Sequence, residues 1–86
     1  MRGRKRIYSV IMKNRDIIRE IVKVKTINDI VNYVKNNNFS EFYFIRRRTG
    51  KIEYYIKKTD NKIYIKDLIN KSIIEVKIYK DEVIEC

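Results

Sequence analysis

The chain concentrates four cations at one point of its sequence, namely Arg46, Arg47, Arg48 and Lys51. Aromatic and aliphatic residues alternate with polar ones on both sides, over 41–47 and 52–58, and this period of two is typical of β-strands. We therefore expect the cations at the tip of a β-hairpin. Arginine binds phosphate oxygens in a two-pronged geometry that lysine lacks. Because exposed ion pairs add only about 0–1 kcal/mol to stability, the pattern predicts a phosphate-binding tip whose arginines the fold does not need.

A second basic group lies at the start of the chain. We expect its cations to contact phosphates together with the hairpin tip; they are Arg2, Arg4, Lys5 and Arg6. Residues 1–5 are predicted to form a mobile basic arm ahead of a single small domain over 6–86. Residues 1–58 hold 16 Lys and Arg against 5 Asp and Glu, whereas residues 59–86 hold 5 against 6. This localised excess indicates an anionic partner. Nucleic acid, either DNA or RNA, is the first expectation and an acidic protein the second.

Alternation sorts the residues of the predicted strands onto two faces of a sheet. One face should pack against a helix, with Phe42, Phe44, Ile52, Tyr54, Ile56, Ile63, Ile65, Ile74, Val76 and Ile78. The other should mix aromatic and basic residues, with Tyr43, Ile45, Arg47, Tyr55, Lys57, Tyr64, Lys66, Lys77 and Tyr79. Aromatic rings can stack on bases while cations neutralise phosphates. Tyr and Lys are also ordinary residues of a solvated sheet face, so this pattern alone fits both interpretations.

Helical periodicity is clearest over residues 27–37, where Thr26 can act as N-cap and Asp29 occupies the capping-box position. One helix face would carry the apolar side chains Ile27, Ile30, Val31 and Val34. The helix should end at residues 36–38, three asparagines, because Asn tolerates the left-handed cap conformation. Residues 17–25 fit both a helical stripe and an alternating strand, and we favour a strand paired in a hairpin with 6–13.

The remaining strands are predicted at 41–47, 52–58, 63–66, 73–79 and 83–85. The expected fold class is α+β, a mostly antiparallel sheet of five to six strands with one helix packed on one face, in the order β-β-α-β-β-β-β. The apolar residues include seventeen Ile and seven Val, and β-branched side chains favour strands.

The chain lacks the residue types that several kinds of enzyme chemistry require. The chain has no His, two Gly and a single cysteine, Cys86, so we expect no cofactor, no metal site and no glycine-rich phosphate loop. Asp67, Glu75 and Lys77 match the pattern of PD-(D/E)xK nucleases, but a match of three residues is a weak signal. A ribonuclease toxin acting through Arg, Lys and Tyr ranks above it, because positioning and electrostatics can suffice for RNA cleavage.

No apolar run approaches the roughly 20 residues that cross a bilayer, and one cysteine fits a reducing compartment. We therefore expect an intracellular protein without a membrane partner. The leading hypothesis is a small, basic, non-enzymatic nucleic-acid-binding protein, of a size that suits a phage or viral regulator. The alternative is a protein-interaction module or inhibitor of an acidic partner, using the tyrosine-rich face. Both hypotheses are compatible with a homodimer.

Overall fold

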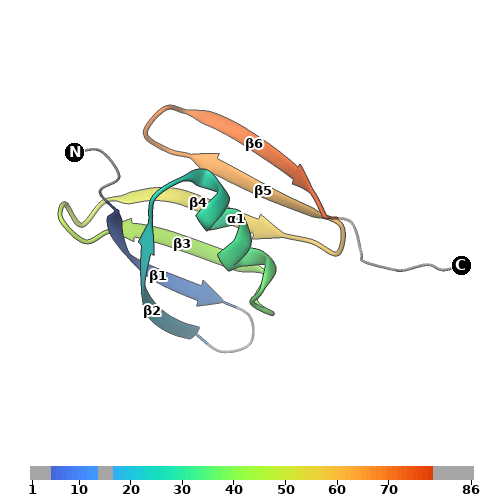
Figure 1. Ribbon diagram of the computed structural model, residues 1–86, viewed down its shortest axis with the longest axis horizontal. Helices are drawn as coiled ribbons and strands as arrows, with labels where there is room; N and C mark the ends of the chain where they lie inside the picture. The colour runs from blue at the N-terminus through green and yellow to red at the C-terminus, as the bar shows by residue number, and fades with distance from the viewer. Residues whose placement is uncertain (1–4, 14–16, 79–86) are drawn as a thin grey trace, which may run out of the picture.

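A computed structural model describes residues 5–13 and 17–78 of the chain. It contains one helix and six strands: β1 (Arg6–Lys13), β2 (Ile17–Val24), α1 (Ile27–Lys35), β3 (Glu41–Arg46), β4 (Ile52–Lys58), β5 (Lys62–Asp67) and β6 (Ser72–Lys77). The strands form one antiparallel sheet in the order β2-β1-β3-β4-β5-β6 (Figure 1). The α+β class and the order of elements are as predicted, and residues 17–24 are a strand. The predicted strand at 83–85 lies outside the described residues.

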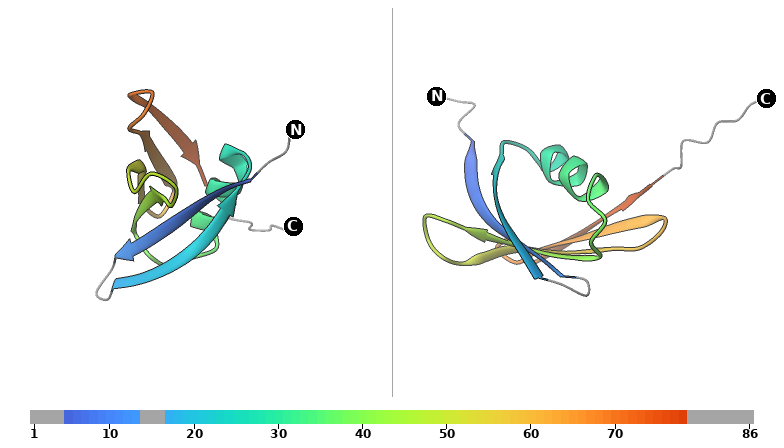
Figure 2. Two further views of the ribbon diagram at one scale, coloured as in Figure 1. Left: turned by 90° about the vertical axis from the view of Figure 1, so that its left-hand side faces the viewer. Right: turned by 90° about the horizontal axis from the view of Figure 1, so that it is seen from below.

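The sheet is curved, and α1 lies in its concave side (Figure 2). We call the side that holds α1 the concave face and the opposite side the open face. Within residues 5–13 and 17–78, no helix or strand covers the open face. Any surface that the strands offer to a large partner is therefore the open face or the ends of the sheet.

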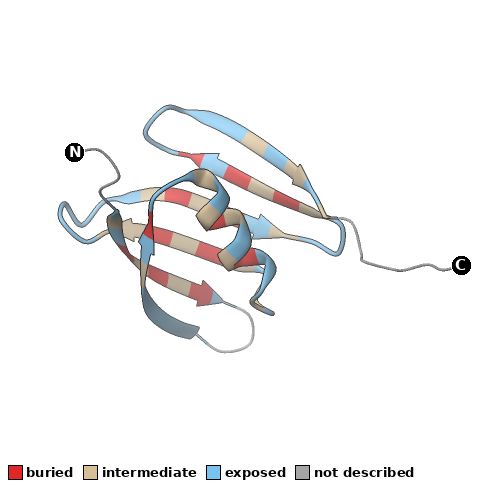
Figure 3. Cartoon of the chain, viewed as in Figure 1, coloured by how far each residue is buried: buried red, intermediate tan, exposed pale blue. Residues whose placement is uncertain are grey.

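The hydrophobic core fills the space between α1 and the concave face. Its fully buried side chains come from the helix and from five strands, as the red bands beneath α1 show (Figure 3), and are Tyr8, Val10, Met12, Val24, Ile30, Val34, Phe42, Phe44, Ile56, Ile63 and Ile65. Tyr33 contributes its ring edge-on to Phe42 and Phe44, with centroids 6.3 and 6.1 Å away. Buried large side chains of this kind contribute roughly 1.5–3 kcal/mol each through removal from water.

One residue predicted for the core face lies elsewhere, because β3 and β4 change register between Phe44 and Ile45. Phe44 pairs with Tyr54 and Ile45 with Ile52, so Glu53 is left over as a β-bulge. Ile52 consequently pairs on the open face and is 43% exposed. The prediction that Ile52 faces the core is therefore wrong, since a bulge of one residue shifts the alternation.

The two ends of α1 are stabilised in different ways. At the start, the Asp29 carboxylate accepts hydrogen bonds from the backbone N–H of Thr26 at 3.0 Å and of Lys25 at 2.7 Å, which holds the pKa of Asp29 below its usual value. This is the capping arrangement predicted from the sequence. At nine residues, α1 is the one helix in the described part of the chain, and it is too short to cross a membrane.

The C-terminal end of α1 does not use a left-handed asparagine, contrary to the prediction. The cap residue Asn36 has φ −87°, and its N–H bonds to the carbonyl of Asn32 at 3.1 Å. The ammonium group of Lys58, on β4, instead donates to the carbonyl of Val34 at 2.9 Å and to that of Asn37. Because a cation from the sheet satisfies the free carbonyls, a left-handed turn is not needed.

Candidate nucleic-acid interface

The four clustered cations do lie at a hairpin tip, between β3 and β4. The N–H of Arg46 donates to the carbonyl of Lys51 at 2.9 Å, and the N–H of Gly50 donates to the carbonyl of Arg46 at 2.7 Å. Gly50 has φ +74°, a conformation that favours glycine and lets the chain reverse. The N–H of Arg47 also donates to the carbonyl of Ile7 at 3.0 Å, so the tip is attached to the start of β1.

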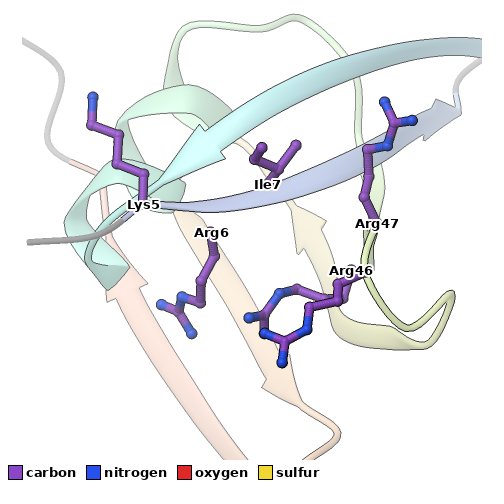
Figure 4. A pocket seen from close by; sticks show the side chains of 6 residues that line it. Lys5, Arg6, Ile7, Arg46 and Arg47 are labelled. Carbon is purple, nitrogen blue, oxygen red and sulfur yellow. The ribbon is translucent and has the colours of Figure 1, made fainter.

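This attachment gathers basic residues from two distant segments around one pocket, which we call the basic pocket. Its volume is about 460 Å³, and it is lined by Lys5, Arg6, Ile7, Arg46, Arg47 and Arg48 (Figure 4). Five of these six residues are cations. Lys51 is exposed at the same tip but does not line the pocket. Arg2 and Arg4, which were expected to assist the tip, lie outside the described residues.

Arg46 differs from the other arginines of the tip because it is bound into the fold. Its guanidinium lies 3.2 Å from a carboxylate oxygen of Glu53, and the two side chains are 22% and 12% exposed. The hydroxyl of the buried Tyr8 donates to the same carboxylate at 2.7 Å. Burial and this hydrogen bond raise the pKa of Tyr8. Glu53 thus holds Arg46 in place, and the bulge in β4 supplies Glu53.

Two guanidinium groups share the ring of Tyr8. The guanidinium carbons of Arg6 and Arg46 lie 5.9 and 5.8 Å from the ring centroid, within the range of a cation–π contact. Figure 4 shows Arg6 and Arg46 pointing to one side of the sheet, and Lys5 and Arg47 to the other. The basic pocket is therefore at the end of the sheet and reaches both of its faces.

The charges of the strands are divided unequally between the two faces. By alternation and register, the open face of the strands carries seven cations, Lys13, Arg19, Lys23, Lys57, Lys62, Lys66 and Lys77. Its acids are Glu41 and Glu75, and Glu75 is already paired with Lys62 at 3.0 Å. Two acids against seven cations leave the open face of the strands with a formal charge of +5.

The concave face, by contrast, is balanced. Its strands carry three cations, Arg6, Arg46 and Lys58, and three acids, Glu20, Glu53 and Asp67. The acids are satisfied inside the domain: Glu53 by Tyr8 and Arg46, Glu20 by the hydroxyl of Tyr33, and Asp67 by the N–H groups of Ile69 and Asn70, both at 3.0 Å. The excess positive charge of the sheet is thus confined to the open face and the tip.

Three of the predicted tyrosines lie on adjacent strands of the open face. Tyr43 and Tyr55 are register partners whose ring centroids are 5.0 Å apart at 47°. Tyr64 follows on β5, opposite Lys57, and Tyr55 is opposite Lys66. All three rings are partly exposed. Burial and the charge of Glu41 raise the pKa of Tyr55. Tyr79, the fourth tyrosine expected here, lies outside the described residues.

On β1 and β2 the open face alternates isoleucines with the cations Lys13, Arg19 and Lys23, and the sequence-based face assignment covered only β3 to β6. The exposed isoleucines of this half are Ile7, Ile17 and Ile21, which are 41%, 70% and 53% exposed. Alternation within 6–13 and 17–24 carries this signal, because the residues between the buried Tyr8, Val10 and Met12 must point outward. The open face therefore has a tyrosine-rich, basic half on β3 to β6 and a half on β1 and β2 where isoleucines alternate with cations.

The nuclease pattern does not form a site. Asp67 is buried on the concave face, where it pairs with Ser72 and accepts turn hydrogen bonds, whereas Glu75 pairs with Tyr64 on the open face. The two carboxylates lie on opposite sides of the sheet, so they cannot hold one metal ion. Across residues 5–13 and 17–78, no three side chains of His, Cys, Asp or Glu gather in a way that could bind a metal.

Comparisons with protein-family models, with curated proteins and with solved structures find no match to this chain.

Proposed function

We propose that this domain binds nucleic acid, non-enzymatically, through the open face and the arginine tip. The observation that carries the proposal is the charge difference between the faces of the sheet: +5 on the open face and balanced charges on the concave face. A folding requirement would not separate charges in this way, since like charges on one face repel each other. A polyanion lying on the open face would remove that repulsion and release counterions as it binds.

Single strands fit this face better than duplexes. Neighbouring strands lie about 4.8 Å apart, so six strands span roughly 24 Å, whereas the major groove of B-DNA is about 12 Å wide. A duplex would meet the face only along its phosphates, apart from the narrow hairpin tip. A single strand can place its bases on Tyr43, Tyr55 and Tyr64 while Lys57 and Lys66 contact phosphates, and stacking is worth about 1–3 kcal/mol per base.

The experiment is a binding titration of fluorescently labelled single-stranded DNA, single-stranded RNA and duplex DNA. Lys57→Gln combined with Lys66→Gln should weaken single-strand binding by about tenfold, because each lost phosphate contact removes an electrostatic contribution. The matched control is Lys25→Gln combined with Lys35→Gln, which removes the same charge from exposed positions beside and on α1. Equal effects of the two pairs would show attraction by net charge alone and would contradict binding at the open face.

A second function is favoured by the exposed isoleucines on the β1–β2 half of the open face. Ile7, Ile17 and Ile21 are 41%, 70% and 53% exposed there, and apolar side chains among polar ones are typical of protein contacts. A protein-interaction module would bind an acidic partner here, with cations steering the approach. If the variant with Ile17→Ser and Ile21→Ser still binds single strands, nucleic acid remains the proposed ligand. If the unmutated protein binds no nucleic acid, the protein partner is favoured instead.

A further inference from the structure

We propose that the basic pocket binds a terminal phosphate monoester of the single strand that lies on the open face. The inference rests on the proposed function, and it assigns the pocket a ligand chemistry of its own. Of the five cations that line the pocket, only Arg46 forms an ion pair with an acid of the described residues, through Glu53 at 3.2 Å. Four cations without a matching acid among the described residues therefore line a volume of about 460 Å³.

The fold fixes the side chains of Arg46 and Arg6 and the backbone of Arg47. Glu53 fixes Arg46, the ring of Tyr8 lies under both Arg46 and Arg6, and the backbone bond from Arg47 to Ile7 fixes the loop. Guanidinium groups that share one ring repel each other when no anion lies between them. A pocket whose positive charges are positioned before the ligand arrives loses little side-chain freedom on binding, so it favours a compact and highly charged anion.

The charge of the ligand distinguishes a strand end from the interior of a strand. An internal phosphodiester carries a single negative charge, whereas a terminal monoester approaches two at neutral pH and has three free oxygens. The arginine fork can hold two of these oxygens at once. The pocket also lies at the end of the sheet and reaches the open face through Arg47 and Ile7. A strand that follows the tyrosines toward the tip would therefore place its end in the pocket.

The test compares one oligonucleotide sequence in three forms: with a 5′-phosphate, with a 3′-phosphate and with hydroxyl groups at both ends. One phosphorylated form should bind about tenfold tighter than the hydroxyl form, because hydrogen bonds to charged groups stabilise a complex by at least that factor. Which end gains affinity gives the polarity of the strand on the sheet. The gain should shrink as the pH falls from about 7.5 to 5, since the second ionisation of a phosphate monoester lies near pH 6.

The variants that test the pocket are Arg48→Ala and Arg6→Ala. Both should reduce the ratio of the affinity for the phosphorylated form to the affinity for the hydroxyl form toward one. Arg48 is exposed and unpaired within the described ranges, so Arg48→Ala keeps the test valid if Arg6→Ala fails to fold. Lys57→Gln should lower both affinities together and leave their ratio unchanged. Equal binding of the three forms overturns this inference while the proposed function stands. No binding of any form, at about 50 mM salt where electrostatic attraction is strong, overturns both.

Discussion

At the scale of single residues, the three adjacent arginines of the tip have different surroundings. Arg46 completes a small network with Glu53 and Tyr8, and its guanidinium is mostly buried. Arg47 and Arg48 are exposed. Sequence reasoning treated the triplet as dispensable for folding, because a run of identical letters gives no sign of which member turns inward. The bulge at Glu53 decides this, and a bulge within Ile52–Ile56 is hidden by apolar residues on both sides of it.

Arg46→Ala should lower the free energy of unfolding by about 1–3 kcal/mol, since it leaves the half-buried carboxylate of Glu53 without its cation. Arg47→Ala and Arg48→Ala serve as matched controls and should change it by at most about 0.5 kcal/mol, as exposed substitutions usually do. Urea unfolding followed by circular dichroism measures all three. If Arg46→Ala is as mild as its neighbours, the Arg46–Glu53 pair is not part of what stabilises the tip.

The phenols of the buried Tyr8 and the partly buried Tyr33 should make the stability of the domain depend on alkaline pH. Burial, followed by a hydrogen bond to a carboxylate, raises the pKa of Tyr8 and of Tyr33. The folded chain keeps these protons where the unfolded chain releases them, so the free energy of unfolding should fall as the pH rises above about 10. In the double variant Tyr8→Phe and Tyr33→Phe, the free energy of unfolding should fall less steeply with pH. The difference in slope should be up to roughly 1.4 kcal/mol per pH unit for each tyrosine removed. Urea titrations across this range measure the slope, and an unchanged slope would contradict the assignment.

At the scale of elements, the sheet stabilises α1 in two ways: it buries the apolar face of the helix, and it supplies a hydrogen-bond donor to the C-terminal carbonyls. Isolated helices of this length are marginal in water, and its last carbonyls bond to Lys58 from β4. Burial lowers the pKa of Lys58. The start of α1 was predictable because Thr26 and Asp29 act locally. The C-terminal cap was not predictable, because it comes from a strand more than twenty residues further along the chain.

Lys58→Met should therefore lower the free energy of unfolding by about 1–2 kcal/mol, since the C-terminal carbonyls of α1 lose a charged donor. Lys57→Met changes the adjacent residue in the same way, but this side chain lies on the open face, so we expect an effect within about 0.5 kcal/mol. Thermal or urea unfolding of the two variants provides the comparison. Equal losses would indicate that Lys58 acts through β4 rather than through the helix end.

Strand faces were the part of the fold that the sequence predicted best. From β3 to β6 the alternation placed Phe42, Phe44, Tyr54, Ile56, Ile63 and Ile65 in the core, and all of them are buried. Periodicity depends only on neighbours in the chain, so it survives without tertiary information. The position of β1 between β2 and β3 could not be read in this way, because strand order depends on contacts between distant segments.

The two faces should respond differently to truncation. Phe44→Ala should cost about 3–5 kcal/mol and Ile56→Ala about 2–5 kcal/mol, because both leave a cavity in the core. Tyr64→Ala and Tyr55→Ala should cost at most about 1 kcal/mol, the value of a cross-strand pair. Chemical denaturation measures these losses. Tyrosine variants as unstable as Phe44→Ala would place those rings in the core and remove them from the binding surface.

At the scale of the whole molecule, one helix on one side explains how a small domain can keep a bare, charged sheet face. The core needs only the concave side, and three of the five acids on the strands are hydrogen-bonded there. The open face is left with cations, tyrosines and isoleucines that add little to stability. The local placement of the charge, rather than the formal net charge of +10, is what a nucleic-acid ligand would recognise.

Binding to single strands should weaken steeply with salt. Each neutralised phosphate contributes a slope of about −0.7 to log K against log salt. Arg47→Ala should reduce the steepness by roughly one contact and weaken binding similarly for all sequences. Tyr64→Ala should lower the affinity for single strands without changing the slope, because a stacked ring releases no counterion. The contrast between these two variants separates phosphate contacts from base stacking in one set of titrations. If Tyr64→Ala changes the slope as Arg47→Ala does, or weakens duplex binding equally, then the tyrosines dock against the backbone and the open face does not hold stacked bases.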